Sequence, residues 1–101
     1  VDAEHLAMPA NDPQVLEGHA DQVASVAFLP TDDASIQRVL TASRDRSARV
    51  WDASTGREVM SLRKHSLGLT AVDAVRQGED GGVLLLTAGL DGRLILWPAG
   101  R

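Results

Sequence analysis

Short apolar runs separated by polar turns recur along most of the chain. Residues 23–28 and 69–74 roughly alternate apolar and polar positions, as strands with one covered face do. Residues 38–42 and 83–88 are almost continuously apolar, which is typical of strands covered on both faces. Three further runs have strand length: 48–51, 58–62 and 94–97. No uninterrupted window has the i, i+3, i+4, i+7 spacing of a helix, so the pattern predicts an all-β chain.

The segments between the runs have the composition of turns and loops. The dipeptides Asp-Arg at 45–46 and Asp-Gly at 91–92 each separate two apolar runs, and Asp-Gly in that position is a strong hairpin signal. Residues 30–33 and 77–82 are polar and rich in turn formers, and a further turn is expected at 53–56. This order predicts units of four short antiparallel strands.

The sequence repeats with a period of 46 residues and no insertion. Four residue pairs define the repeat: His19 and His65, Thr41 and Thr87, Asp45 and Asp91, Trp51 and Trp97. Both tryptophans and two of the three histidines belong to these pairs. A fixed period of this length is typical of repeat architectures, in which each unit buries its apolar face against the next.

The first copy contains three short motifs in this order: Gly18-His19, Thr41-Ala42-Ser43-Arg44-Asp45 and Val50-Trp51-Asp52. Together they resemble the WD-repeat family of β-propellers. The second copy departs from that pattern at Lys64, before its histidine, and at Pro98, after its tryptophan. The resemblance covers residues 14–97. It implies an all-β fold of two four-stranded antiparallel blades of a WD-repeat β-propeller, which form an incomplete ring because propellers have about four to eight blades.

The resemblance also implies a hydrogen-bonded relay in each copy. The turn aspartate accepts from the histidine, the strand hydroxyl contacts that histidine, and the tryptophan indole donates to the hydroxyl. The implied members are His19, Thr41, Asp45 and Trp51, then His65, Thr87, Asp91 and Trp97. Such a relay satisfies half-buried polar groups, each of which would cost about 1–3 kcal/mol if left unpaired.

A hydroxyl, a histidine and an aspartate are also the parts of a nucleophilic triad. This set, however, occurs twice at one spacing, whereas an active site is normally built once per fold, and no G-x-S-x-G motif is present. The chain has no H-E-x-x-H spacing, and the glycines at 78, 81 and 82 are not followed by the Lys-Ser or Lys-Thr of a phosphate loop. We therefore expect no enzyme activity, no metal site and no cofactor.

The repeat divides the chain into an N-terminal extension at 1–13, a first WD repeat at 14–56 and a second at 57–101. Residues 14–16 correspond to 60–62, so the first repeat is expected to open with an outer strand, and the second lacks a closing one. Two blades cannot close a ring, and two hypotheses follow. Either the chain is the C-terminal part of a larger propeller protein, or copies join head to tail into a closed six- or eight-bladed propeller.

Composition narrows the setting of the protein. The 101 residues include no cysteine, so the fold holds together by packing without disulfides. A net charge of −4 disfavours nucleic acid, because phosphate binding relies on Lys and Arg. The longest apolar run, 83–86, is far below the roughly 20 residues that span a bilayer, and the first residues do not resemble a secretory leader. We expect a cytoplasmic protein that binds neither nucleic acid nor membrane.

WD-repeat propellers mostly act as rigid platforms for other proteins, so the resemblance implies a non-catalytic protein-protein interaction scaffold, regulatory or signalling in role. Its partners would be other protein chains or the remaining blades of the propeller. One loop face is expected to carry Arg44, Arg46, Arg63 and Lys64 beside Glu17 and Asp21. The opposite face is expected to carry Asp32, Asp33, Glu79 and Asp80. The first face suits an acidic peptide or a phosphate. An accessory, substrate-positioning part of an enzyme is the alternative.

Overall fold

The computed structural model describes residues 13–31, 33, 35–78 and 82–100. Regular structure in these residues is entirely β-strand, as the hydrophobic pattern predicts. The strands are β1 (Val23–Phe28), β2 (Arg38–Ser43), β3 (Ala48–Asp52), β4 (Arg57–Leu62), β5 (Leu69–Gln77), β6 (Gly82–Gly89) and β7 (Leu94–Gly100). None of the described residues forms a helix long and apolar enough to cross a membrane.

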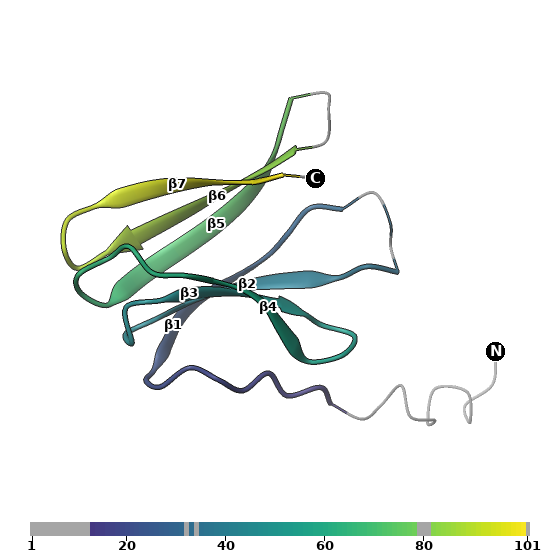
Figure 1. Ribbon diagram of the computed structural model, residues 1–101, viewed down its shortest axis with the longest axis horizontal. Coiled ribbons are helices and arrows are strands. Elements are labelled where there is room, and N and C mark those ends of the chain that lie inside the picture. The colour runs from purple at the N-terminus through teal and green to yellow at the C-terminus, as the bar shows by residue number, and fades with distance from the viewer. Residues whose placement is uncertain (1–12, 32, 34, 79–81, 101) are drawn as a thin grey trace.

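The strands form two antiparallel sheets (Figure 1). Strands β1 to β4 make a four-stranded sheet, which we call sheet A, and β5 to β7 make a three-stranded sheet, which we call sheet B. The 46-residue repeat is visible in the register, because Leu40 pairs with Val50 in sheet A as Leu86 pairs with Leu96 in sheet B. Each first strand also carries a register shift at the same repeat position. The two sheets are successive blades of the expected propeller type, and they do not form a closed ring.

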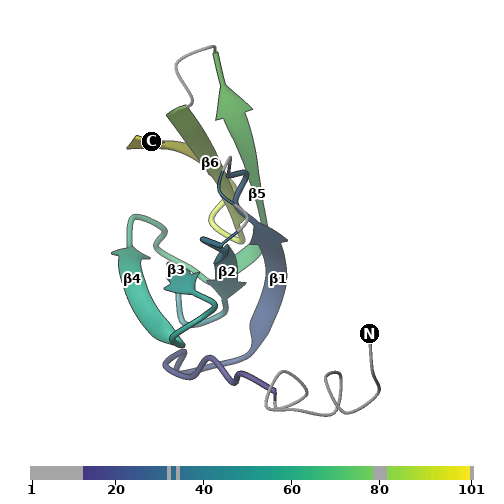
Figure 2. The same cartoon turned by 90° about the vertical axis from the view of Figure 1, so that its right-hand side faces the viewer.

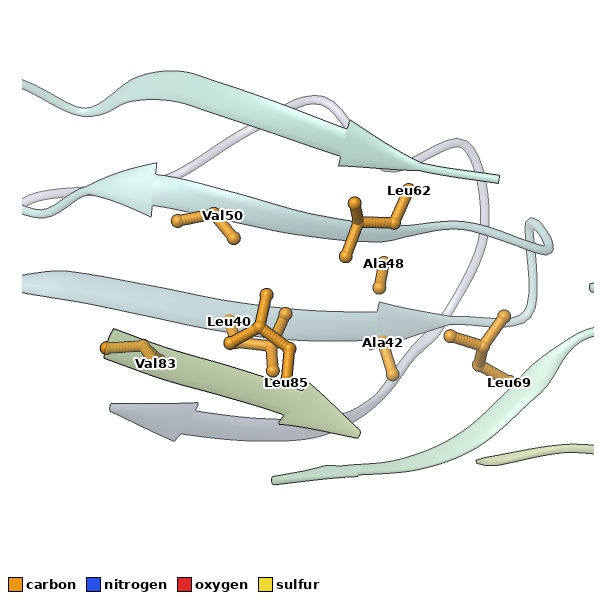
Figure 3. Packing of buried hydrophobic residues seen from close by; sticks show 8 residues of the cluster. All are labelled: Leu40, Ala42, Ala48, Val50, Leu62, Leu69, Val83 and Leu85. Atoms are coloured by element: carbon orange, nitrogen blue, oxygen red, sulfur yellow. The ribbon is translucent and has the colours of Figure 1, made fainter. Parts of the chain in front are cut away.

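The hydrophobic core lies between the two sheets (Figure 3). Its buried members are Leu40, Ala42, Ala48, Val50 and Leu62 from sheet A, and Leu69, Val83 and Leu85 from sheet B. Strands β1 and β5 lie side by side at this junction (Figure 2), and the backbone N–H of Val72 donates to the Ser25 hydroxyl at 3.3 Å. The stacking of one sheet on the next, rather than either sheet alone, therefore buries the apolar face of β2 and β3.

Two strand boundaries differ from those that the sequence predicts. Strand β7 continues past Trp97 and includes Pro98, which an edge strand tolerates because the missing N–H faces away from β6. The outer strand expected at 14–16 is not formed: these residues carry no strand assignment, and Val15 is 64% exposed. A strand needs a neighbour to supply its ladder hydrogen bonds, and β4 already occupies the corresponding edge of sheet A. The extension at 1–13 lies almost entirely outside the described residues.

Candidate functional site

Four side chains meet at one end of sheet A. The imidazole of His19 lies 2.8 Å from Asp45 Oδ2 through Nδ1 and 2.6 Å from Thr41 Oγ1 through Nε2. The indole N–H of Trp51 donates to the same Thr41 oxygen at 2.8 Å. Because a carboxylate only accepts, Nδ1–H donates to Asp45, and the neutral ring then accepts the Thr41 O–H at Nε2. Trp N–H, Thr O–H and His N–H thus point along one chain that ends on the carboxylate.

The local backbone holds the members of this relay in place. Thr41 and Trp51 are on the neighbouring strands β2 and β3, His19 is on the segment before β1, and Asp45 is on the β2–β3 turn. The Asp45 carboxylate also accepts the backbone N–H of Ala20 at 3.0 Å, so it joins the turn to the segment that carries the histidine. The His19 and Trp51 rings contact edge to face, with centroids 5.9 Å apart.

The same arrangement recurs in sheet B. His65 Nδ1 lies 3.0 Å from Asp91 Oδ1, and His65 Nε2 lies 2.8 Å from Thr87 Oγ1. The Trp97 indole N–H donates to that hydroxyl at 2.9 Å, and the backbone N–H of Ser66 donates to Asp91 Oδ2 at 2.9 Å. The structure therefore brings all eight relay residues together as two sets, in spite of the altered residues beside His65 and Trp97.

The surroundings of the two aspartates differ. In sheet A the Ser47 hydroxyl and backbone N–H both donate to Asp45 Oδ1, at 2.5 and 2.9 Å. Arg93 stands at the place of Ser47 in sheet B and contributes only its backbone N–H, at 3.0 Å from Asp91 Oδ1. Asp45 consequently accepts one more side-chain hydrogen bond than Asp91.

Both carboxylates are held in the ionised form. Burial raises the pKa of Asp45, but hydrogen bonds from Ser47, His19 and the N–H of Ala20 outweigh it and bring that pKa well below its ordinary value. Burial likewise opposes ionisation of Asp91, yet the hydrogen bonds from His65, Ser66 and Arg93 lower its pKa to about 2. Each aspartate is therefore charged at neutral pH and acts as an acceptor.

The relay geometry does not suit nucleophilic chemistry. Thr87 is fully buried and Thr41 is only 7% exposed, and each hydroxyl oxygen already accepts an indole N–H. A nucleophile must reach the substrate carbonyl, which these oxygens cannot do without dismantling the relay. In the part of the chain that the structure describes, no three His, Asp or Glu side chains are grouped so that they could hold a metal ion. The sets are arranged to satisfy buried polar groups.

The cations of the expected partner face lie on two loops at one end of the sheets. Arg44 and Arg46 are on the β2–β3 turn, Arg63 and Lys64 are on the β4–β5 connection, and all four are exposed. The strand registers place both loops at the same end, on the left in Figure 1. The loops also touch, because a Cβ added to Gly68 would lie 2.9 Å from Arg44 Cα.

The acidic residues of the opposite face are described only in part. Asp33 lies on the β1–β2 loop at the other end of sheet A, and its carboxylate accepts hydrogen bonds from Ser35. The other three, Asp32, Glu79 and Asp80, lie outside the described residues.

Some polar contacts were not identified from the sequence. Ser43 is fully buried, donates to the Gln22 carbonyl at 2.9 Å and accepts the Asp45 N–H; its place in the first motif was the available signal. Ser47 gives no repeat signal, because the second copy has an arginine there. The ion pair of Arg49 with Glu58, at 2.7 Å, is likewise confined to sheet A.

Stacked four- and three-stranded antiparallel sheets, each with the same His-Asp-Thr-Trp relay, define a repeat protein of the β-blade class. Residues 11–52 match the family described as WD domain, G-beta repeat. The chain is 33% identical over 66 residues to the nuclear distribution protein PAC1 of Komagataella phaffii, which covers 65% of this chain and 13% of that protein. It is 49% identical over 50 residues to WD repeat-containing protein 41 of Mus musculus, covering 46% and 11%. PAC1 of Arthroderma otae is 35% identical over 96 residues, covering 88% and 20%.

The chain belongs to the WD-repeat family. It spans between 11% and 20% of the length of these three relatives. Proteins of this family are generally non-catalytic scaffolds that bind other proteins, and membership implies a protein-interaction scaffold role for this chain.

Proposed function

We propose that the chain supplies two blades of a larger cytoplasmic propeller, which serves as a non-catalytic scaffold in a regulatory or signalling protein. Its binding surface is the loop face formed by Arg44, Arg46, Arg63 and Lys64, and its partner is a protein segment rich in carboxylates or phosphates. The observation that carries this proposal is the grouping of these four exposed cations at one end of the sheets.

The charge balance of this face supports an anionic partner. Within the described residues, the four cationic side chains make no hydrogen bond or ion pair. Asp45 and Asp91, the nearest acids in the turns, are engaged by their histidines and by backbone N–H groups. The arginines are thus available for bidentate contacts with oxyanions, which are stronger than neutral hydrogen bonds.

The backbone of Arg46 supports the same proposal. Its φ is 78°, a left-handed conformation that residues other than glycine rarely adopt, and the equivalent residue of the second copy is Gly92. A side chain kept at a position where glycine is conformationally easier is consistent with a role for that side chain.

Binding of a fluorescent acidic peptide tests the proposal. The probe is a dodecapeptide of alternating glutamate and serine, compared with its glutamine counterpart and with its serine-phosphorylated form. We expect the double variant Arg44→Glu/Arg46→Glu to weaken binding by about tenfold or more, equivalent to about 1.4 kcal/mol. The matched control is Arg38→Glu/Arg57→Glu, which makes the same charge change at exposed residues of the other end. Equal loss in both double variants, or no loss in either, refutes a binding surface at these loops.

A further inference from the structure

The outer face of sheet B is apolar and uncovered. It consists of Val75 on β5, Leu84 and Leu86 on β6, and Leu94 and Leu96 on β7. Leu94 is 72% exposed, Leu96 is 59% exposed and Val75 is 56% exposed. Side chains of this face line a shallow groove of about 100 Å³. A contiguous apolar patch of this kind marks an interaction surface.

The repeat shows what such a face is built to contact. The residues 46 positions before Leu86, Leu94 and Leu96 are Leu40, Ala48 and Val50, which are 0%, 0% and 2% exposed. These earlier residues belong to the core between sheets A and B. The outer face of sheet B therefore repeats the face that sheet A buries against the following sheet.

The complementary face is present on the same chain. The outer face of sheet A carries Val23, Val26 and Phe28, which are 45%, 63% and 66% exposed. Their repeat equivalents are Leu69, Val72 and Ala74, all of which pack against sheet A. One chain thus exposes both halves of an interface whose internal version it already contains.

The strand edges match in the same way. Strand β7 is the last strand of sheet B, and no described residue pairs with its outer edge. Residues 14–16 are the repeat equivalents of 60–62 in β4, the strand that covers β3 in sheet A. They carry no strand assignment of their own. An unpaired edge and an unpaired segment with the sequence position of its neighbour favour strand addition.

We propose that the outer face of sheet B binds the outer face of sheet A of a second copy of this chain, and that residues 14–16 of the second copy extend sheet B along β7. The pairs Ala48 with Leu62 and Arg49 with Ser61 set the register. Their equivalents place Leu94 opposite Leu16 and Ile95 opposite Val15 of the second copy. Such a contact is head to tail, so it repeats from copy to copy and completes a ring when the rotation closes.

The new contact differs from the internal one in two respects. Leu94 and Leu96 are larger than the Ala48 and Val50 that they replace, and Val23 on the facing sheet is one methylene shorter than Leu69. The Ser25–Val72 hydrogen bond is lost, because its equivalents are Ala71 and Val26. The contact between copies is therefore more apolar than the contact within one chain.

Mass measurement across concentration tests the proposal on the chain itself. Light scattering from low to high micromolar concentration is expected to show multimers, and Leu96→Glu is expected to shift them to the monomer. The control is Leu67→Asp, which removes a 47%-exposed leucine on the β4–β5 connection, where the first copy has Asp21. A wild-type chain that stays monomeric throughout, or equal loss of multimers in both variants, overturns the proposal.

Cross-linking tests the register without relying on a loss of assembly. The chain has no cysteine, so a disulfide can form only between introduced residues. Directly opposed strand residues lie within reach of a disulfide. The pair Val15→Cys/Ile95→Cys is expected to give covalent multimers under mild oxidation, and Ser61→Cys/Ile95→Cys is not, because Ser61 is already paired with Arg49. Equal cross-linking of both pairs indicates random edge contact and overturns the register.

The inference rests on the proposed function only in requiring a larger propeller. A monomer that still distinguishes the acidic peptide from its glutamine counterpart refutes the second copy and leaves the binding face intact. Multimers that fail to bind the peptide have the opposite meaning.

Discussion

Arg46 and Gly92 share one backbone conformation at equivalent places in the two β-turns, with φ of 78° in each. In the left-handed region an L residue with a Cβ is strained by roughly 1–2 kcal/mol, whereas glycine is not. Two turns of the same shape therefore carry different conformational costs. The difference is set by one side chain and can be measured by exchanging it.

We expect Arg46→Gly to stabilise the protein by about 0.5–1 kcal/mol, because relief of the strained backbone exceeds the added freedom of the unfolded chain. Gly92→Ala is expected to destabilise it by about 1 kcal/mol through the backbone alone, since a Cβ at Gly92 has no atom within 4 Å. Thermal unfolding followed by circular dichroism measures both. The same sign of change in the two variants would contradict the explanation.

The shared hydroxyl of each relay should be costly to remove. Thr87→Val keeps the shape of the side chain but leaves the Trp97 N–H and His65 Nε2 without a partner in a buried place. We expect a loss of about 1–3 kcal/mol, seen as a lower midpoint in urea or heat. Thr41→Val should behave in the same way. Thr70→Val, at an exposed threonine of β5, is the control and should change the midpoint little.

The fold follows from the sequence as far as local pattern and repetition carry it. The apolar runs and the turns at 45–46 and 91–92 predict all seven strands, because pleated half-buried strands and tight turns have local signatures. The segment at 14–16 shows the limit. It has the sequence of an outer strand, but the ladder that would make it one comes from a neighbour that sheet A does not provide.

The site divides in the same way. The period of 46 residues brings the eight relay residues to attention, because side chains at equivalent places of stacked blades repeat their contacts. Ser47 could not be found so, since its hydrogen bonds to Asp45 have no counterpart beside Asp91. The left-handed backbone of Arg46 did have a signal, the glycine at 92, which shows that a comparison of the copies carries conformational information as well.

The relay carboxylates make stability depend on acid pH. The pKa of Asp91 falls from an ordinary 3.8 to about 2 on folding, and that of Asp45 falls as well. A lowered pKa contributes stability that is fully present above the unfolded value and is lost as the pH falls through the folded one. The melting temperature should therefore drop between about pH 4 and pH 2.

The acid-induced drop should be smaller in Asp45→Asn/Asp91→Asn, which is less stable at neutral pH but has lost the titrating groups. Asp21→Asn, at an exposed aspartate outside both relays, serves as the control and should keep the full drop. Melting curves at intervals between about pH 5 and pH 2 measure the three proteins. Parallel curves for all of them would show that other groups cause the acid dependence.

Gly89 leaves space for the second relay, whereas the first copy has Ser43 at that position. A Cβ added to Gly89 would lie 2.5 Å from His65 Nδ1 and 2.8 Å from Asp91 Oδ1, so Gly89→Ala must push these two groups apart. We expect a loss of about 1–3 kcal/mol, as for other overpacked sites. In a chain that already carries Asp91→Ala, the same substitution should cost less, because the pair it disrupts is gone. Additive losses in this double-mutant cycle would mean that Gly89 acts on the strand and not on the relay.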